Sequence, residues 1–184
     1  MGIDVYLRWR GMTLAEKRAQ YTGFNTEAGS VGYLREAYHG SPYATQALVP
    51  EGWEEDRDDF EGIDGFSGIP IEAAVLRKRL PAVVLLAMYR NHMLYEQGRT
   101  PGAIDADRPV EGLLKAASRA FSEMEDRSAI SLAESIRPDQ IEKAEAIIES
   151  RQLPGFALAF VDFVELAERK QLETGEPCRI LVSA

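Results

Sequence analysis

Apolar and polar residues alternate strictly at the start of the chain. The apolar residues take the odd positions: Ile3, Val5, Leu7 and Trp9. A period of two predicts a β-strand that buries one face. Residues 178–182 are short, apolar and β-branched, which predicts a second strand. Because helical patterns fill much of the chain between them, we expect these two strands to share one small sheet.

Two patterns in the first half of the chain predict helices. Thr13 and Glu16 have the spacing of a capping box, in which each side chain satisfies a backbone amide at the helix start. A short helix to about Tyr21 should follow. Residues 70–79 are also predicted to be helical, and Pro81 is expected in the first turn of a new helix that reaches about residue 97. Residues 82–88 are apolar all round, so that helix should be central and buried.

Prolines mark the starts of three more predicted helices. The helix after Pro109 has an apolar face with i, i+3, i+4, i+7 spacing, formed by Val110, Leu113, Leu114, Ala117, Phe121 and Met124. Pro138 and Pro154 each precede another helical pattern, and Gly175 is well placed to end the last one.

Together these patterns predict an α+β fold. The 184 residues, of which 45% are hydrophobic, suffice for one compact domain with a sizeable core. We expect a single domain over residues 1–184, whose small sheet includes the N- and C-terminal strands and is packed by about five helices. Residues 44–49 are the best candidate for a further strand. The alternative is a mainly α-helical fold with minor β additions.

Residues 21–68 form a glycine- and tyrosine-rich region within this domain. They contain eight of the 15 glycines and four of the seven tyrosines. Long loops in compact domains are either functional or disordered, and the aromatic content argues against disorder. We therefore expect this loop region to carry the functional site.

Much of the acidic charge falls in the same region. The formal net charge is −9, from 30 acidic and 21 basic residues, and residues 51–64 hold eight acids and one base. The overall field repels nucleic acid and anionic membranes, so neither is expected as a partner. The acidic run is either a solvated loop, partly neutralised by the basic residues 77–79, or a surface for a basic protein. The candidate partner-binding residues are Glu54, Glu55, Asp56, Asp58 and Asp59.

No metal or cofactor is expected. Two histidines and one cysteine are too few for a zinc site of the usual Cys/His type. In a calcium loop that starts at Asp56, Phe60 and Glu61 stand where a third ligand and the turn glycine belong. The sequence motifs of phosphate-binding loops, dinucleotide-binding turns, nucleophile elbows and zinc-protease helices are also absent.

The sequence favours a soluble, cytoplasmic protein. Cys178 is the only cysteine, so no disulfide can form within the chain, and its place in a predicted strand indicates an inert, buried thiol. The first residues lack the basic and apolar regions of a secretory signal. The longest apolar run, residues 80–89, has about half the length that a membrane-spanning helix needs.

The strongest candidate for a ligand site is the segment from Tyr33 to Tyr43. If residues 33–39 are helical, Arg35 and His39 lie on one side and can jointly grip an anionic group. His39 suits proton transfer near neutral pH, and Glu36 could orient it. A structural reading stays open, in which the tyrosines pack, Arg35 pairs with an acid and His39 ends a helix. The candidate ligand-binding residues are Tyr33, Arg35, Tyr38, His39, Tyr43 and Trp53.

The segment GYLREAYHG, residues 32–40, together with the opening MGIDVY, resembles small bacterial or phage-borne proteins of unknown function. The resemblance covers the first quarter of the chain and implies a bacterial cytoplasmic setting. It implies no activity, so no functional residue is carried over from it.

Two classes of function remain open. The first is a noncatalytic binding or interaction protein, inhibitor-like or immunity-like, whose acidic and aromatic loop region meets a basic protein or a small anionic ligand. The second is a hydrolase or transferase for a small anionic substrate, with Arg35 binding charge and His39 transferring protons. The first is favoured because it requires fewer unseen residues. Self-association into a homo-oligomer is compatible with both.

Overall fold

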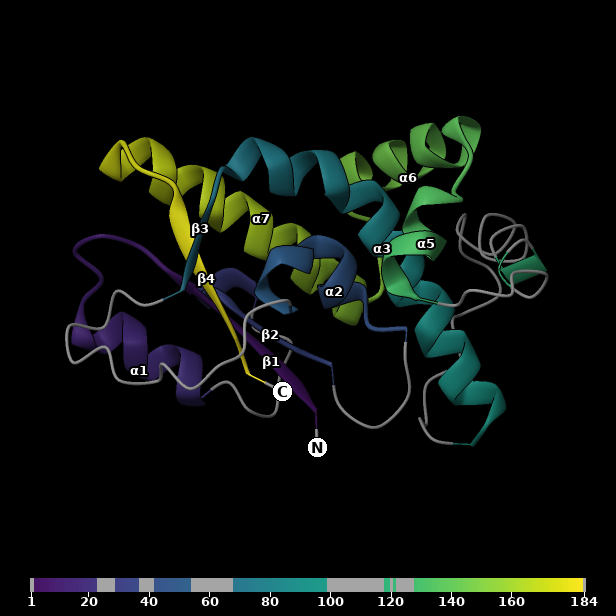
Figure 1. Ribbon diagram of the computed structural model, residues 1–184, viewed down its shortest axis with the longest axis horizontal. Helices are drawn as coiled ribbons and strands as arrows, with labels where there is room; N and C mark the ends of the chain where they lie inside the picture. Colours follow the sequence, from purple (N-terminus) through teal and green to yellow (C-terminus); the bar gives the residue numbers. More distant parts are fainter. Residues whose placement is uncertain are drawn as a thin grey trace.

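The computed structural model describes residues 2–22, 29–36, 42–53, 68–98, 118–119, 121 and 128–183. In these residues one antiparallel sheet has the spatial order β2 (Tyr33–Glu36), β1 (Ile3–Arg8), β4 (Cys178–Ser183) and β3 (Ile69–Ile71) (Figure 1). The strands from the two ends of the chain are the inner pair, with Leu7 opposite Ile180. The α+β prediction and the shared sheet are therefore confirmed.

The helical elements of the described residues pack against this sheet or against one another (Figure 1). In chain order they are α1 (Leu14–Thr22), the 3-10 turn η1 (Gly29–Val31), α2 (Ala44–Leu48), the 3-10 turn η2 (Pro50–Trp53), α3 (Ala73–Glu96), α5 (Ala129–Glu134), α6 (Pro138–Ser150) and α7 (Gly155–Thr174). Figure 1 shows α3 and α7 together on one side of the central strands and α1 on the other. The odd-numbered residues of β1 face the α3–α7 side and belong to the main hydrophobic core.

Several predicted helix boundaries are confirmed. At the start of α1 the Thr13 amide donates to Glu16 Oε2 at 2.8 Å, and the Glu16 amide donates to Thr13 Oγ1 at 3.2 Å, which is the predicted capping box. Helix α6 begins at Pro138, and α7 follows Pro154 directly. Gly175 ends α7 with a φ of 72°, in the left-handed region that glycine adopts without a Cβ clash.

The prediction of two helices around Pro81 is wrong. Pro70 lies in β3, and a single helix, α3, runs from Ala73 to Glu96 with Pro81 inside it. A proline in a helix interior removes one backbone hydrogen bond and bends the helix, but it does not end a helix that packing holds in place. Leu80 and the apolar residues after Pro81 are buried on all sides, and Figure 1 shows α3 changing direction along its length.

Residues 44–49 were also predicted wrongly, because they contain α2 and not a strand. An apolar run of this length suits either element by its pattern alone. The start of α2 finds a hydrogen-bond acceptor in the Glu36 carboxylate, which takes bonds from the amides of Ala44 (3.0 Å) and Thr45 (2.7 Å). With η1, β2 and η2, this helix shows that the described parts of residues 21–68 are regular structure and not one long loop.

Helix α5 was not predicted, and it starts at Ser128, whose hydroxyl accepts a bond from the Ser131 amide at 3.2 Å. Most of the predicted helix after Pro109 lies outside the described residues. Phe121 from that segment is buried, with its ring centroid 4.8 Å from that of Tyr89 on α3. The inward face predicted for this segment is thus supported at Phe121.

Candidate functional site

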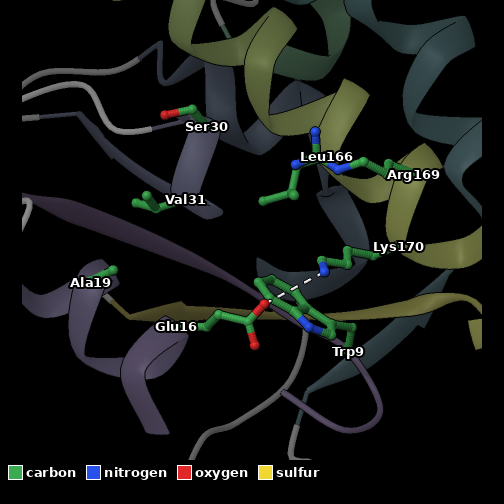
Figure 2. A pocket seen from close by; sticks show the side chains of 8 residues that line it. All are labelled: Trp9, Glu16, Ala19, Ser30, Val31, Leu166, Arg169 and Lys170. Atoms are coloured by element: carbon green, nitrogen blue, oxygen red, sulfur yellow. Dashed lines mark ion pairs between the residues drawn. The ribbon is translucent and has the colours of Figure 1, made fainter. Parts of the chain in front are cut away.

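A pocket of about 150 Å³ opens where β1 ends, between α1, η1 and α7 (Figure 2). Its lining residues are Trp9, Glu16, Ala19, Ser30, Val31, Leu166, Arg169 and Lys170. Trp9 continues the inward-facing odd positions of β1 by one residue beyond the strand. Residues three or four apart lie on one helix face, which is why Glu16 and Ala19 of α1, and Leu166 and Lys170 of α7, meet in the same space.

The deeper part of the pocket is apolar. Trp9 is 5% exposed and Leu166 is 4% exposed, so both present a face to the pocket while most of their surface is packed. Val31 and Ala19 add partly exposed apolar walls. An apolar surface that is open to solvent on one side favours the binding of an apolar group.

One ion pair crosses the pocket above the indole of Trp9. Lys170 Nζ lies 3.5 Å from Glu16 and 2.9 Å from Glu173, and it is 5.0 Å from the centroid of the Trp9 ring. The hydrogen bond with Glu173 raises the pKa of Lys170, and the bond from the Thr13 amide lowers the pKa of Glu16. Lys170 and Glu16 are therefore both charged near neutral pH. Figure 2 shows this pair spanning the space from α7 to α1.

Arg169 differs from Lys170 because it has no such partner. Its side chain is exposed at the rim and makes no hydrogen bond or ion pair with the part of the chain that the structure describes. In Figure 2 its side chain extends from α7 toward the open space of the pocket. The rim thus carries Lys170, which is neutralised by two acids, and Arg169, which pairs with no carboxylate of the described residues.

Two residues of the predicted ligand site, Tyr33 and Arg35, lie in β2 and not in a helix. The predicted helical spacing of Arg35 and His39 is therefore wrong. Alternating side chains put Tyr33 and Arg35 on the sheet face opposite the core. The Tyr33 hydroxyl donates to Asp4 Oδ1 at 2.5 Å, and Arg35 Nε is 3.8 Å from the same oxygen. Burial and the bond to Asp4 raise the pKa of Tyr33 far above its ordinary value, so it stays a neutral donor.

The neighbouring residues on this face form a packed aromatic cluster. The Tyr6 ring centroid lies 5.2 Å from Tyr33 and 5.6 Å from Tyr21, and the guanidinium carbon of Arg8 is 5.4 Å from the Tyr6 ring. Arg8 is 6% exposed and donates to Gln20 and to the Tyr21 hydroxyl. The prediction that β1 buries only one face is therefore wrong, because these tyrosines and α1 also cover Arg8 and Tyr6.

Tyr43 belongs to a different environment, on the core side of β2. Its ring lies 5.0 Å from the guanidinium carbon of Arg90, whose Nε is 3.7 Å from the Glu36 carboxylate. Glu36 also accepts a bond from the Thr45 hydroxyl at 2.7 Å. Glu36 therefore holds the start of α2 in place. Its predicted role of orienting His39 stays a prediction, because His39 lies outside the described residues. Tyr43 and the pair Tyr33–Arg35 lie on opposite sides of the sheet and do not form one site.

The other predicted site residues lie outside the described residues. These are Tyr38, His39, Glu54, Glu55, Asp56, Asp58 and Asp59, together with the side chain of Trp53, whose backbone ends η2. At the described start of the acidic run, Glu51 Oε1 is 2.6 Å from Arg79 Nη2. This pair agrees with the expectation that the basic residues 77–79 neutralise part of the run.

Cys178 is fully buried in β4, and burial raises the pKa of its thiol to about 11, so the predicted inert thiol is supported. Among the residues that the structure describes, no cluster of His, Cys, Asp and Glu side chains could hold a metal ion. No helix in these residues is long and apolar enough to span a membrane.

Sequence reasoning missed the pocket as a whole, although it placed Trp9 on the buried face of the first strand. The adjacent cations at positions 169 and 170 were a weak signal, because basic pairs are common on helix surfaces. Comparison with protein families, with curated proteins and with solved structures finds no significant match to this chain. The case for a function therefore depends on the geometry of the chain itself.

Proposed function

We propose that this protein is a noncatalytic binding protein and that the pocket above Trp9 receives a small ligand. The observation that carries the proposal is the combination of an apolar floor with a charged rim in a half-open cavity of about 150 Å³. Binding sites for small molecules have this form, with a mostly apolar lining and few polar groups that orient the ligand.

The chemistry of the lining supports binding over catalysis. Glu16 and Lys170 are held in their charged forms by each other and by further partners, so neither is poised to exchange a proton near neutral pH. None of the described residues that line the pocket is a histidine or a cysteine. The alternative enzyme with Arg35 and His39 loses the helical spacing that brought those two residues together.

The acidic run keeps its place in this proposal as a predicted surface for a basic protein. Its described end, Glu51, is engaged by Arg79. Glu54, Glu55, Asp56, Asp58 and Asp59 remain the residues whose charge reversal should abolish such an interaction while leaving the fold intact. Pull-down of basic partners by the native and charge-reversed chains measures this directly, and equal recovery by both would remove the idea.

Benzyl alcohol is a suitable first probe for the pocket, because its size matches the cavity and it carries no charge. A cavity of about 150 Å³ in another protein accepts benzene. With roughly eight heavy atoms, such a probe should bind with a Kd on the order of 1 mM. Ligand-observed NMR detects binding in this range of Kd. A change in the chemical shift of the Trp9 indole N–H in the protein spectrum then reports where the probe binds. The Trp53→Phe variant assigns that signal, because Trp9 and Trp53 are the two tryptophans of the sequence.

Two matched variants test whether the probe occupies this cavity. Ala19→Leu adds three carbons to the pocket wall in α1, whereas Ala74→Leu makes the same change at an exposed site of α3. We expect Ala19→Leu to remove the probe signal and Ala74→Leu to keep it. Binding that Ala19→Leu leaves unchanged, with no response at Trp9, would exclude this pocket as the site.

A further inference from the structure

The charges around the pocket are unequal in a way that bears on its ligand. Lys170 is neutralised by Glu16 and Glu173, at 3.5 and 2.9 Å. Arg169 has no carboxylate partner among the described residues and projects toward the same cavity. An arginine guanidinium is a planar donor that suits a carboxylate, to which it can donate two hydrogen bonds. The rim therefore favours an anionic group at the mouth of the pocket.

The space and the lining restrict the rest of the ligand. About 150 Å³ holds one ring or one short branched chain, and the floor at that depth is the indole of Trp9 with the side chain of Leu166. The face of an indole packs well against another flat ring. Lys170 lies over part of this floor and is held there by its two acids. A cationic ligand that entered the pocket would meet the positive charge of Arg169 at its rim.

We infer that the ligand is a small aromatic carboxylate of the benzoate class, with its ring above Trp9 and Leu166 and its carboxylate on Arg169. This inference rests on the proposed binding function and adds the charge and shape of the ligand. Glu16 opposes such a ligand, because its carboxylate lines the same pocket. Its bonds to the Thr13 amide and hydroxyl, at 2.8 and 2.9 Å, hold that carboxylate in place, and Lys170 at 3.5 Å offsets its negative charge.

The test compares benzoate with benzyl alcohol, which have similar rings but differ in charge at neutral pH. Titrations at low ionic strength with the native chain should give a Kd for benzoate that is roughly three- to fivefold lower, as expected for one exposed ion pair. Arg169→Gln should bring the two Kd values together. Lys78→Gln removes the same charge from an exposed site of α3 and should leave the ratio unchanged.

The outcomes separate this inference from the proposed function. If benzyl alcohol binds above Trp9 and benzoate binds no more tightly, the pocket is a binding site but not for carboxylates, and the inference is overturned. If Arg169→Gln and Lys78→Gln reduce the benzoate preference equally, the preference reflects overall charge, which also overturns the role of Arg169. If neither compound binds at tens of millimolar, roughly ten times the expected Kd, the proposed function fails together with the inference.

Discussion

The buried pair of Glu36 and Arg90 offers the sharpest test of how this fold is held together. Their side chains are 7% and 9% exposed, and besides this ion pair the carboxylate accepts three hydrogen bonds from Ala44 and Thr45. Glu36 thus joins an edge strand, a short helix and the long central helix at one point. The perturbation we choose is Glu36→Gln, which keeps the shape of the side chain and removes its charge.

The expected cost follows from what the substitution leaves behind. The glutamine amide group cannot accept hydrogen bonds on both of its terminal atoms, so at least one donor at the start of α2 loses its acceptor. The Arg90 guanidinium meanwhile stays buried without its counter-charge at 3.7 Å. Breaking a buried ion pair from one side costs about 3–5 kcal/mol, and we expect Glu36→Gln near the lower limit of roughly 3 kcal/mol.

Urea unfolding, monitored by circular dichroism, measures this cost as a decrease in the midpoint urea concentration at an unchanged m value. Arg90→Met and the double variant complete a thermodynamic cycle, in which we expect a coupling energy of about 1–3 kcal/mol. Glu176→Gln is the matched control, because Glu176 pairs with Arg10 at only 2.7 Å but with exposures of 38% and 68%. Such an exposed pair should contribute less than about 1 kcal/mol despite the shorter distance.

Two results would refute this reasoning. One is a loss of less than about 1 kcal/mol for Glu36→Gln, which would place the pair with ordinary surface pairs. The other is additivity of the two single substitutions within about 0.5 kcal/mol, which would show that Glu36 and Arg90 act independently. A loss of the same size for Glu176→Gln would also show that burial is not what distinguishes the two pairs.

Three further predictions concern single positions and use the same unfolding assay. A Cβ on Gly29 would lie 1.8 Å from the Ala159 carbonyl oxygen, so Gly29→Ala should cost more than about 2 kcal/mol of unfolding free energy. Gly175 lies in open space at φ 72°, so Gly175→Ala should cost only about 1 kcal/mol. Equal costs for the two substitutions would contradict the close contact at Gly29. Arg151 adopts a φ of 53°, so Arg151→Gly should be about 1 kcal/mol more stable than Arg151→Ala, which loses the same ion pairs. Burial raises the pKa of Cys178 from 9.0 to about 11, so the folded state holds this proton more tightly and the unfolding free energy should fall as pH rises between these values. A smaller fall in Cys178→Ala is the expected result, and an identical fall would assign the effect to other groups.

The elements that were predicted correctly are those whose sequence patterns lie within a few neighbouring residues. The alternation in β1, the capping box of α1 and the glycine that ends α7 each depend on residues within a few positions of one another. Helix α2 is different, because its five residues become a helix next to Glu36, which supplies the acceptor for its first amides from another element. Pro81 was misread for a related reason: the packing that keeps α3 continuous comes from residues far away in the sequence.

The predicted helical spacing of Arg35 and His39 was wrong for the same kind of reason. The interpretation of Tyr33, Arg35 and His39 assumed a helical period of about 3.6 residues, but the pairing of β2 with β1 imposes a period of two. Tyr33 lies opposite Tyr6 and Arg35 lies opposite Asp4, so their side chains meet those of β1 on one face. Pairing between strands that are about thirty residues apart leaves little trace in a short segment, and the period cannot be chosen without knowing the partner strand.

The pocket lies at the C-terminal end of β1, where the pairing of β1 with its neighbouring strand ends. Arg8 is the last residue of β1 with a strand partner, Arg179, and Trp9 follows it with the inward orientation of the odd positions. Beyond that pair Trp9 has no strand neighbour among the described residues. Helices α1 and α7 and the turn η1 lie around its indole instead, and the space between them is the cavity. The ion pair of Lys170 with Glu16 joins two of these elements across the opening. A ligand that enters must therefore fit beside a fixed pair of charges, which leaves Arg169 as the rim cation that can select it.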